Sequence, residues 1–461
     1  MKNFVRDEED NESGEEDQIA KKIRLQHLHD TIRRILRVTP LGCGILLNIL
    51  IELFPQRSRD VRLQTEFARE SLRVGEYVPV LRDKLLGIII ERLLDLDVSL
   101  AIEMESQQRL LEENGILNFQ DYKKLKISRE ESEIAEKIDA ILCVLFDYFD
   151  ECIEKKRSSA ALFKCTLDYF DKLILRTNRA KFVQFFMFYI CKSKTSFVDA
   201  FLKLLLDRVT DEKEDILVRN SAANYLGSFV ARANFVRFES LKSILKQAVD
   251  WLILKQQKFS STPLRIFDAL FQAIIYILIF KGPRFNGLSY MKTVDGWNDL
   301  NKTLDRVPLY LKEEYLAYIA KENSGTLDKN IVNESDDDKM AHLLLEFPFD
   351  PLDSSMLENA AKKIEPIYQT WKNVDSIEGP NDEIVDDENE VEEEDLVSKD
   401  LLNKTIPNPI KIEKIRKLLG MEDNIVFPSP NLKPIMKDKD IKNEPRQRGF
   451  STLSVDSRGS W

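Results

Sequence analysis

The chain has 461 residues, of which 43% are hydrophobic and 32% are charged, and its formal net charge is −11. Sequence-independent binding of duplex DNA needs a cationic surface that displaces counterions, so this charge argues against that class and favours a protein partner. Glycine and proline are scarce and alternating β-type runs are few, which argues against a β-rich fold and predicts an all-α chain.

The N-terminal part of the sequence changes from an acidic stretch to helical patterns. Residues 1–18 are polar and acidic, and we expect them to be disordered. Apolar residues recur at helical spacing from residue 19 onward, and several arginines lie on one predicted helix over residues 57–73. We interpret these arginines as a solvated helix face with intrahelical pairs to Glu66 and Glu70, with a phosphate-facing strip as the alternative.

A long polar connection is predicted at residues 105–132, which contain Ser128 and Ser132. Long connections in compact chains are often functional or mobile. The central stretch, residues 176–235, then shows apolar residues at helical spacing in three successive blocks. This pattern predicts three amphipathic helices, with a polar turn at residues 210–215 between the second and the third.

Hydrophobic blocks recur along the chain as helix pairs of roughly 40 residues, a period typical of HEAT or armadillo-like repeats. We therefore predict a helical-repeat superhelix over residues 19–372, with flexible connections near 105–132 and 321–339. Residues 281–298 contain several glycines and a proline and are predicted to form a loop. Stacked repeats present a long surface that suits the binding of another large protein.

The C-terminal part begins with a rigid turn at residues 347–351 (FPFDP), because both prolines restrict the backbone. Residues 373–400 are predicted to be a disordered acidic loop, since residues 382–395 carry ten acidic side chains and no basic one. A returning helical segment is expected at 401–430 and a disordered tail at 431–461.

No arrangement of residues in the sequence predicts an enzyme. A phosphate-binding glycine loop, an HExxH motif, a nucleophile elbow and a Cys/His cluster are all missing from it, and we expect no cofactor. Five scattered cysteines indicate buried thiols of a reducing compartment. The apolar run at residues 271–280 is about half a bilayer span, which favours a buried core helix over a membrane contact.

Three stretches carry a family resemblance: RNSAANYLGSFVARA at 219–233, LRVGEYVPVLR at 72–82, and FPFDP at 347–351 followed by IEPIYQTW at 364–371. In this order they resemble the RNA polymerase I-specific initiation factor family of the TIF-IA type. The motif residues are mostly apolar or small, so we expect them to define the fold rather than an interface. They are Arg219, Asn224, Tyr225, Gly227, Ser228, Phe229, Arg232, Phe347, Pro348, Phe349, Asp350 and Pro351.

The resemblance implies a nuclear and nucleolar factor that binds RNA polymerase I and bridges it to core promoter factor subunits bound at the promoter. It also implies control by phosphorylation of surface serines, for which Ser128 and Ser132 are the candidates, and it allows a homodimer of the free protein. We expect little or no direct binding of duplex DNA. Two alternatives stay open: a HEAT-repeat transport or trafficking scaffold, and a nucleic-acid-binding protein that uses the arginines of residues 57–73.

Overall fold

The protein is described by a computed structural model, which defines residues 15–113, 129–154, 159–177, 180–256, 264–324, 347–350, 352 and 354–370. All of these residues belong to one compact unit, residues 1–403, and a second unit comprises residues 404–461. Every element in the described ranges is helical, apart from an isolated β-bridge between Ala233 and Tyr368. The predicted all-α fold class is therefore confirmed.

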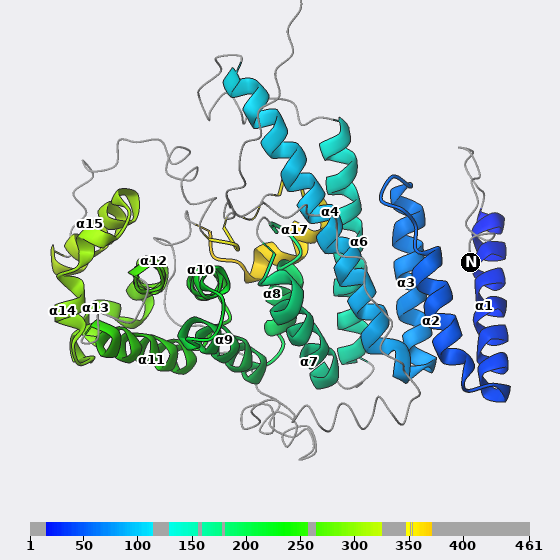
Figure 1. The fold of residues 1–461 in the computed structure, drawn as a ribbon, viewed down its shortest axis with the longest axis horizontal. Coiled ribbons are helices and arrows are strands. Elements are labelled where there is room, and N and C mark those ends of the chain that lie inside the picture. Colours follow the sequence, from blue (N-terminus) through cyan, green and yellow to red (C-terminus); the bar gives the residue numbers. More distant parts are fainter. Residues whose placement is uncertain are drawn as a thin grey trace, which may run out of the picture. The chain divides into compact units, whose positions relative to one another are not determined.

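The first half of the described chain consists mainly of long helices (Figure 1). Helix α3 begins after Asp60, whose carboxylate accepts the N–H of Arg62 at 3.0 Å, and α4 begins at Pro79, a residue favoured in the first helical turn. Helix α3 packs against both α4 and α6. The elements are α1 (Glu15–Val38), α2 (Gly42–Leu53), α3 (Val61–Tyr77), α4 (Pro79–Glu113), α6 (Arg129–Glu154), α7 (Ser159–Tyr169) and the π-helix η1 (Phe170–Ile174).

The central stretch contains the three predicted helices, which are α8 (Phe185–Cys191), α9 (Thr195–Thr210) and α10 (Ile216–Arg232). Every residue of α8 is buried. The predicted turn between α9 and α10 ends at Asp215, whose carboxylate caps α10 by accepting the N–H of Leu217 at 2.8 Å. The prediction of three helices and an intervening polar turn is thus confirmed, but α8 is buried on all sides and is not amphipathic as predicted.

The remaining helices complete the repeat pattern, in which a helix packs against its sequence neighbour or against the next helix but one: α10 contacts α9 and α12, and α12 contacts α11 and α13 and also α15. They are α11 (Phe238–Gln256), α12 (Leu264–Phe285), α13 (Gly287–Thr293), α14 (Trp297–Asn301), the 3-10 helix η2 (Leu304–Arg306), α15 (Leu309–Ser324), α17 (Glu358–Ile364) and the 3-10 helix η3 (Glu365–Ile367). Residues 271–280 lie in α12 and are almost entirely buried, as predicted for a core helix.

The loop predicted at residues 281–298 is wrong. Helix α12 continues through Pro283 to Phe285, and α13 and the start of α14 fill the rest of this range. Proline is tolerated because it lies in the last turn, close to where the helix ends anyway. The chain turns at Asn286 and Gly296, which both adopt left-handed conformations with φ of 51° and 78°.

Two predicted segment boundaries also differ from the structure. Helix α1 already begins at Glu15, within the range 1–18, and acidic residues such as those after Gly14 are favourable at a helix N-terminus. The polar range 105–132 is helical up to Glu113 and again from Arg129, because it holds good helix formers and no glycine or proline before Gly115.

Other predicted segments lie outside the described residues. These are residues 1–14, residues 325–339 of the predicted connection at 321–339, the acidic loop at 373–400, the returning segment at 401–430 and the tail at 431–461. Of the 321–339 connection, the first residues belong to α15, which ends at Ser324.

Candidate functional site

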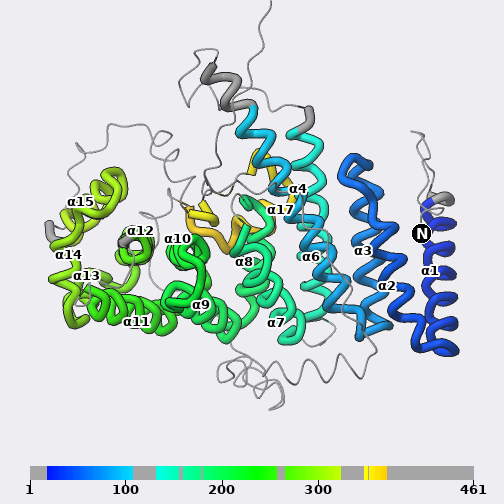
Figure 2. Tube along the Cα trace, viewed as in Figure 1, coloured from blue at the N-terminus to red at the C-terminus, as the bar shows by residue number. Residues whose placement is uncertain are grey.

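The late segment, by which we mean the described residues between 347 and 370, packs onto the central helices although it is distant from them in sequence. In Figure 2 its yellow trace lies beside α8 and α10. The Gln184 side-chain amide donates to the carbonyl oxygen of Pro348 at 2.6 Å. Backbone hydrogen bonds join Asn234 to Ile367 at 3.1 Å and Gln369 to Arg232 at 2.7 Å. The late segment is thus hydrogen-bonded to α10 and to the residues that flank α8 and α10.

Phe349 is the apolar anchor of the late segment and is completely buried. Its ring lies 5.3–5.8 Å, between centroids, from four rings of α8 and α10: Phe185, Phe188, Tyr225 and Phe229. Ring pairs at such separations stabilise a core beyond their buried area alone. Phe347 stacks on Tyr276 of α12, with centroids 4.0 Å apart, so the two aromatic residues of the motif join three helices.

A buried ion pair lies next to this aromatic cluster. The Arg232 guanidinium donates to the carboxylate of Asp350, which also accepts the hydroxyl of Tyr276. Arg232 donates further to the Gln369 carbonyl oxygen at 3.0 Å, and its guanidinium lies 4.0 Å from the ring centre of Phe280. Burial alone would lower the pKa of Arg232, but the facing carboxylate of Asp350 raises it overall. Arg232 therefore remains charged inside the core.

Helix α10 approaches α12 closely because residue 227 is a glycine. A Cβ atom at Gly227 would lie 2.9 Å from both the Cα and the Cβ of Ala273. The next residue, Ser228, accepts the N–H of Phe349 at 3.4 Å and donates to the Asn224 carbonyl oxygen at 2.7 Å. These residues fix the spacing between α10, α12 and the late segment.

The other motif residues are placed as follows. Arg219 is buried at the start of α10, where its Nε donates to the Val209 carbonyl oxygen at 2.8 Å, and Tyr225 and Phe229 belong to the aromatic cluster. Pro351 lies outside the described residues. The described motif residues therefore come together at the junction of α10, α12 and the late segment, apart from Arg219, which joins α9 to α10.

Two buried carboxylates that the sequence analysis missed hold distant segments in place. Asp97 of α4 accepts backbone N–H groups of Lys181, Phe182 and Val183 at 2.8–3.1 Å. Burial raises the pKa of Asp97 to about 6, although these hydrogen bonds favour its charged form. The signal in the sequence is an acidic residue inside an apolar helical run, which is costly unless it is satisfied.

The second such carboxylate is Asp139 of α6. It accepts the backbone N–H groups of Asn359 and Ala360 at 2.7–3.2 Å, and thus caps the start of α17. The side-chain amide of Asn359 donates to it as well, at 2.9 Å. Through Asp139 the late segment is attached to α6 as well as to the central helices.

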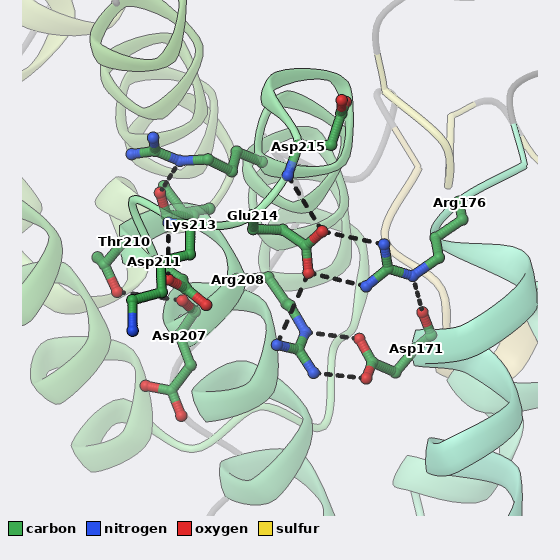
Figure 3. Close-up of polar contacts among 11 residues, drawn as sticks. Asp171, Arg176, Asp207, Arg208, Thr210, Asp211, Lys213, Glu214 and Asp215 are labelled. Carbon is green, nitrogen blue, oxygen red and sulfur yellow. Dashed lines mark hydrogen bonds and ion pairs between the residues drawn. The ribbon is translucent and has the colours of Figure 1, made fainter. Parts of the chain in front are cut away.

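An ion-pair network ties η1 to the turn between α9 and α10, and Figure 3 shows its members facing one another. Arg208 forms a two-pronged pair with Asp171 at 2.6 and 2.7 Å, and Arg176 forms another with Glu214 at 2.8 and 2.9 Å. Arg208 also lies 3.8 Å from Glu214, which links the two pairs. Paired hydrogen bonds of this kind fix geometry as well as charge.

Only one of the two candidate phosphorylation sites lies within the described residues. Ser132 is exposed in the first turns of α6, whereas Ser128 lies outside the described residues. Ser132 precedes Glu136 by four residues, so both lie on one face of α6. Glu136 lines an open groove of about 310 Å³ between α3, α6 and α17, together with Val61, Arg62, Thr65, Glu66, Arg69, Asp139, Ala140 and Asn359.

The arginines of residues 57–73 are only partly paired within their helix. Arg73 pairs with Glu70 at 3.4 Å, as predicted, but Glu66 pairs with Lys21 of α1 instead of an arginine. This part of the prediction is wrong because α1 packs along α3 and supplies the nearer cation. Arg62 and Arg69 are exposed at the groove.

Within the described ranges, no group of three or more histidine, cysteine or acidic residues could hold a metal ion, and all five cysteines are free thiols. One helical stretch there, Arg265–Phe285, is long and apolar enough to cross a membrane, but 83% of its apolar window is buried in the protein. The described geometry is that of a helical scaffold with an exposed surface.

The sequence model of the family described as RNA polymerase I specific transcription initiation factor RRN3 matches residues 1–309. The chain belongs to this family. Among RRN3 proteins, the mouse (Mus musculus) factor is 27% identical over 75% of this chain, and the Schizosaccharomyces pombe factor is 23% identical over 78% of it. The alignments cover 60% and 69% of those two proteins, so the chain spans about three fifths of the mouse relative.

The fold of the RRN3 family is seen in a crystal structure titled RNA polymerase I transcription initiation factor Rrn3. It is 20% identical to this chain, with a TM-score of 0.59 that covers 75% of this chain and 73% of that one. This likeness shows that the two share a helical-repeat fold. The match of the family's sequence model over residues 1–309 confirms the family that the sequence motifs resemble, and this family is one of transcription initiation factors and not of enzymes.

Proposed function

We propose that the protein acts as an initiation factor for RNA polymerase I in the nucleus, with the nucleolus as its main site. In this role it binds the polymerase and bridges it to core promoter factor subunits at the promoter. The observation that carries the proposal is the family match over residues 1–309, together with relatives named for this function. The scaffold geometry supports it, because stacked helices offer a large surface for a multisubunit partner.

We further propose that phosphorylation of Ser132, and of Ser128, weakens the contact with the polymerase. Ser132 is exposed, as are Glu133 beside it and Glu136 one turn later, whereas Glu131 is buried. A phosphate adds nearly two negative charges, so it would make this face strongly acidic and repel an acidic partner surface. Since negative charge is favourable near a helix N-terminus, the modification should leave α6 folded.

The test is affinity capture of the tagged protein from its own cells, with identification of the retained proteins by mass spectrometry. We expect subunits of RNA polymerase I and of the core factor to dominate. Recovery of coat or nuclear-transport proteins without the polymerase would contradict the proposed function and favour a trafficking scaffold.

The phosphorylation step is tested in the same assay with Ser132→Asp. A like charge at an interface costs about 1 kcal/mol or more, so we expect the retained polymerase to fall at least about fivefold. Ser289→Asp is the matched control, because Ser289 is also exposed on a helix but lies in α13. Equal retention by both variants would contradict the role of Ser132 while leaving the polymerase contact intact.

A further inference from the structure

An exposed aliphatic surface lies where α1 turns into α2. It consists of Ile35 and Val38 at the end of α1 and of Leu41, Ile45 and Ile49 at the start and along α2, with exposed fractions from 44% for Ile49 to 95% for Leu41. We call these five residues the corner patch. The turn between the helices is tight, with hydrogen bonds from Gly42 to Thr39 at 2.9 Å and from Thr39 to Ile35 at 2.8 Å, so the two groups of side chains are neighbours.

Helix α2 is apolar on both sides, although only one side is covered. Leu47 and Leu50 are buried, and α2 packs against α1 and α4. Leu41, Ile45 and Ile49 are four residues apart and form one row along the opposite side. A helix that is apolar all round is normally buried, and single exposed aliphatic residues are common whereas a continuous row is not. The corner patch is therefore expected to be covered by a partner.

The charge around the corner patch indicates the partner's chemistry. Residues 31–51 contain three arginines, at 33, 34 and 37, and no acidic residue, whereas both flanking positions are acidic: Asp30 in α1 and Glu52, which is exposed in α2 one turn after Ile49. Arg33 pairs with Asp30 at 3.0 Å and lies over the Tyr77 ring. Arg34 and Arg37 are exposed, and no described residue forms an ion pair with them. The α1 side of the corner patch is thus bordered by two arginines that are open to a partner, and its far end on α2 by the single carboxylate of Glu52.

We propose that the corner patch binds an amphipathic helix of another protein, one with an aliphatic face bordered by glutamate or aspartate. The aliphatic face would cover Leu41, Ile45 and Ile49, and the acidic residues would meet Arg34 and Arg37. A second copy of this chain fits less well, because the only acidic residues that flank its own corner patch in sequence are Glu52 and Asp30, and Asp30 is already paired with Arg33. This inference does not depend on the proposed function, since it names no polymerase subunit.

The test measures fluorescence anisotropy of a labelled helical peptide of about 20 residues, long enough to form a helix. The probe has leucine at positions i, i+3 and i+4 of each seven-residue repeat, so that leucine recurs at i+7, and it has glutamate at most other positions. A second peptide carries lysine in place of glutamate. We expect saturable binding of the glutamate peptide by the full chain. Leu41→Glu/Ile45→Glu should weaken it at least about tenfold, and Arg34→Glu/Arg37→Glu should weaken it about tenfold at low salt, with a smaller effect near 0.5 M salt.

The control is Leu309→Glu, which adds a charge at an equally exposed leucine of α15 and should leave the affinity unchanged. All these positions are exposed, so helical content by circular dichroism should be the same in each variant. Equal binding of the lysine peptide, or unchanged affinity of Leu41→Glu/Ile45→Glu, would overturn the proposal.

Three further results would replace the proposed occupant with another. A dimer in analytical ultracentrifugation that Leu41→Glu/Ile45→Glu dissociates would show that a second copy covers the corner patch. Tenfold tighter peptide binding after removal of residues 1–14 would show that the chain's own acidic N-terminus does so. Binding of the protein to phosphatidylserine vesicles, lost in the same double variant and without peptide binding, would show a membrane contact.

Discussion

The buried pair between Arg232 and Asp350 allows a quantitative test of how the late segment is held. Their side chains are 1% and 0% exposed, so removal of one partner acts on a charge that water does not reach. Asp350→Asn removes the carboxylate that faces the guanidinium while it preserves the size of the side chain. Breaking a buried pair in this way costs about 3–5 kcal/mol of unfolding free energy.

The contacts that survive the substitution place the expected cost at the lower end of this range. The amide oxygen introduced by Asp350→Asn still accepts the hydroxyl of Tyr276. Arg232 still donates to the Gln369 carbonyl oxygen at 3.0 Å and still lies over the Phe280 ring. We therefore expect a loss of ~3 kcal/mol, which lowers the urea midpoint by roughly 1–2 M at a slope of ~2 kcal/mol/M.

The assay is urea unfolding followed by circular dichroism for Asp350→Asn, Arg232→Met and the double variant. Because each single change leaves one charge buried, the two costs should not add, and the double-mutant cycle should give a coupling of about 2–3 kcal/mol. Lys302→Met is the control, since Lys302 and Asp299 form a pair that is 75% and 69% exposed, worth under ~1 kcal/mol. If Asp350→Asn costs no more than Lys302→Met, or if the single costs add, the buried pair does not hold the late segment as argued.

Three further predictions concern Asp97, Gly227 and Arg208. The pKa of Asp97 rises from 3.8 in the unfolded chain to about 6 in the folded protein, so its stabilising contribution is full below pH 3.8 and is lost as the pH rises through 6. The urea midpoint of the wild type, measured relative to that of Asp97→Asn, should therefore decrease as the pH is raised from 3.8 to 6, and an increase would contradict this. Gly227→Ala should lower the free energy of unfolding by about 1–3 kcal/mol in the same assay, because the added Cβ clashes with α12. The control Gly44→Ala lies in α2 with nothing within 4 Å of the added Cβ and should raise the free energy of unfolding by ~0.5–1 kcal/mol; equal effects of the two changes would refute the close approach of α10 and α12. Arg208→Gln should cost roughly 1 kcal/mol at low salt and less in ~1 M NaCl, and a cost independent of salt would show that its pair with Asp171 is not the cause.

The local structure of the chain could largely be predicted from the sequence, because local patterns determine it. The spacing of apolar residues gave the three central helices, and the polar turn that ends at Asp215 follows from helix-capping preferences. The loop predicted at 281–298 was wrong because proline near a helix end and residues in left-handed turns are compatible with short helices. Such positions look the same as loops when only glycine and proline content is considered.

The site could be predicted only as a set of motif residues and not as an arrangement. No local pattern states that Asp350 faces Arg232, 118 positions earlier, or that Asp139 caps a helix 220 positions later. Both contacts depend on how the late segment crosses the helices. The sequence signal that could have suggested them is the isolated charged residue in an apolar run, which requires a partner somewhere in the fold but does not identify it.

The docking of the late segment has a consequence for synthesis of the protein on the ribosome. The rings of Phe185, Phe188 and Phe229 emerge well before Phe349, which completes their cluster. At about 5–20 residues per second, translation from residue 232 to residue 350 takes roughly 6–24 s. During this interval the aromatic pocket and the Arg232 guanidinium lack their final cover. The nascent chain therefore exposes an aromatic surface between α8 and α10 that can be covered only after residues 347–370 leave the exit tunnel.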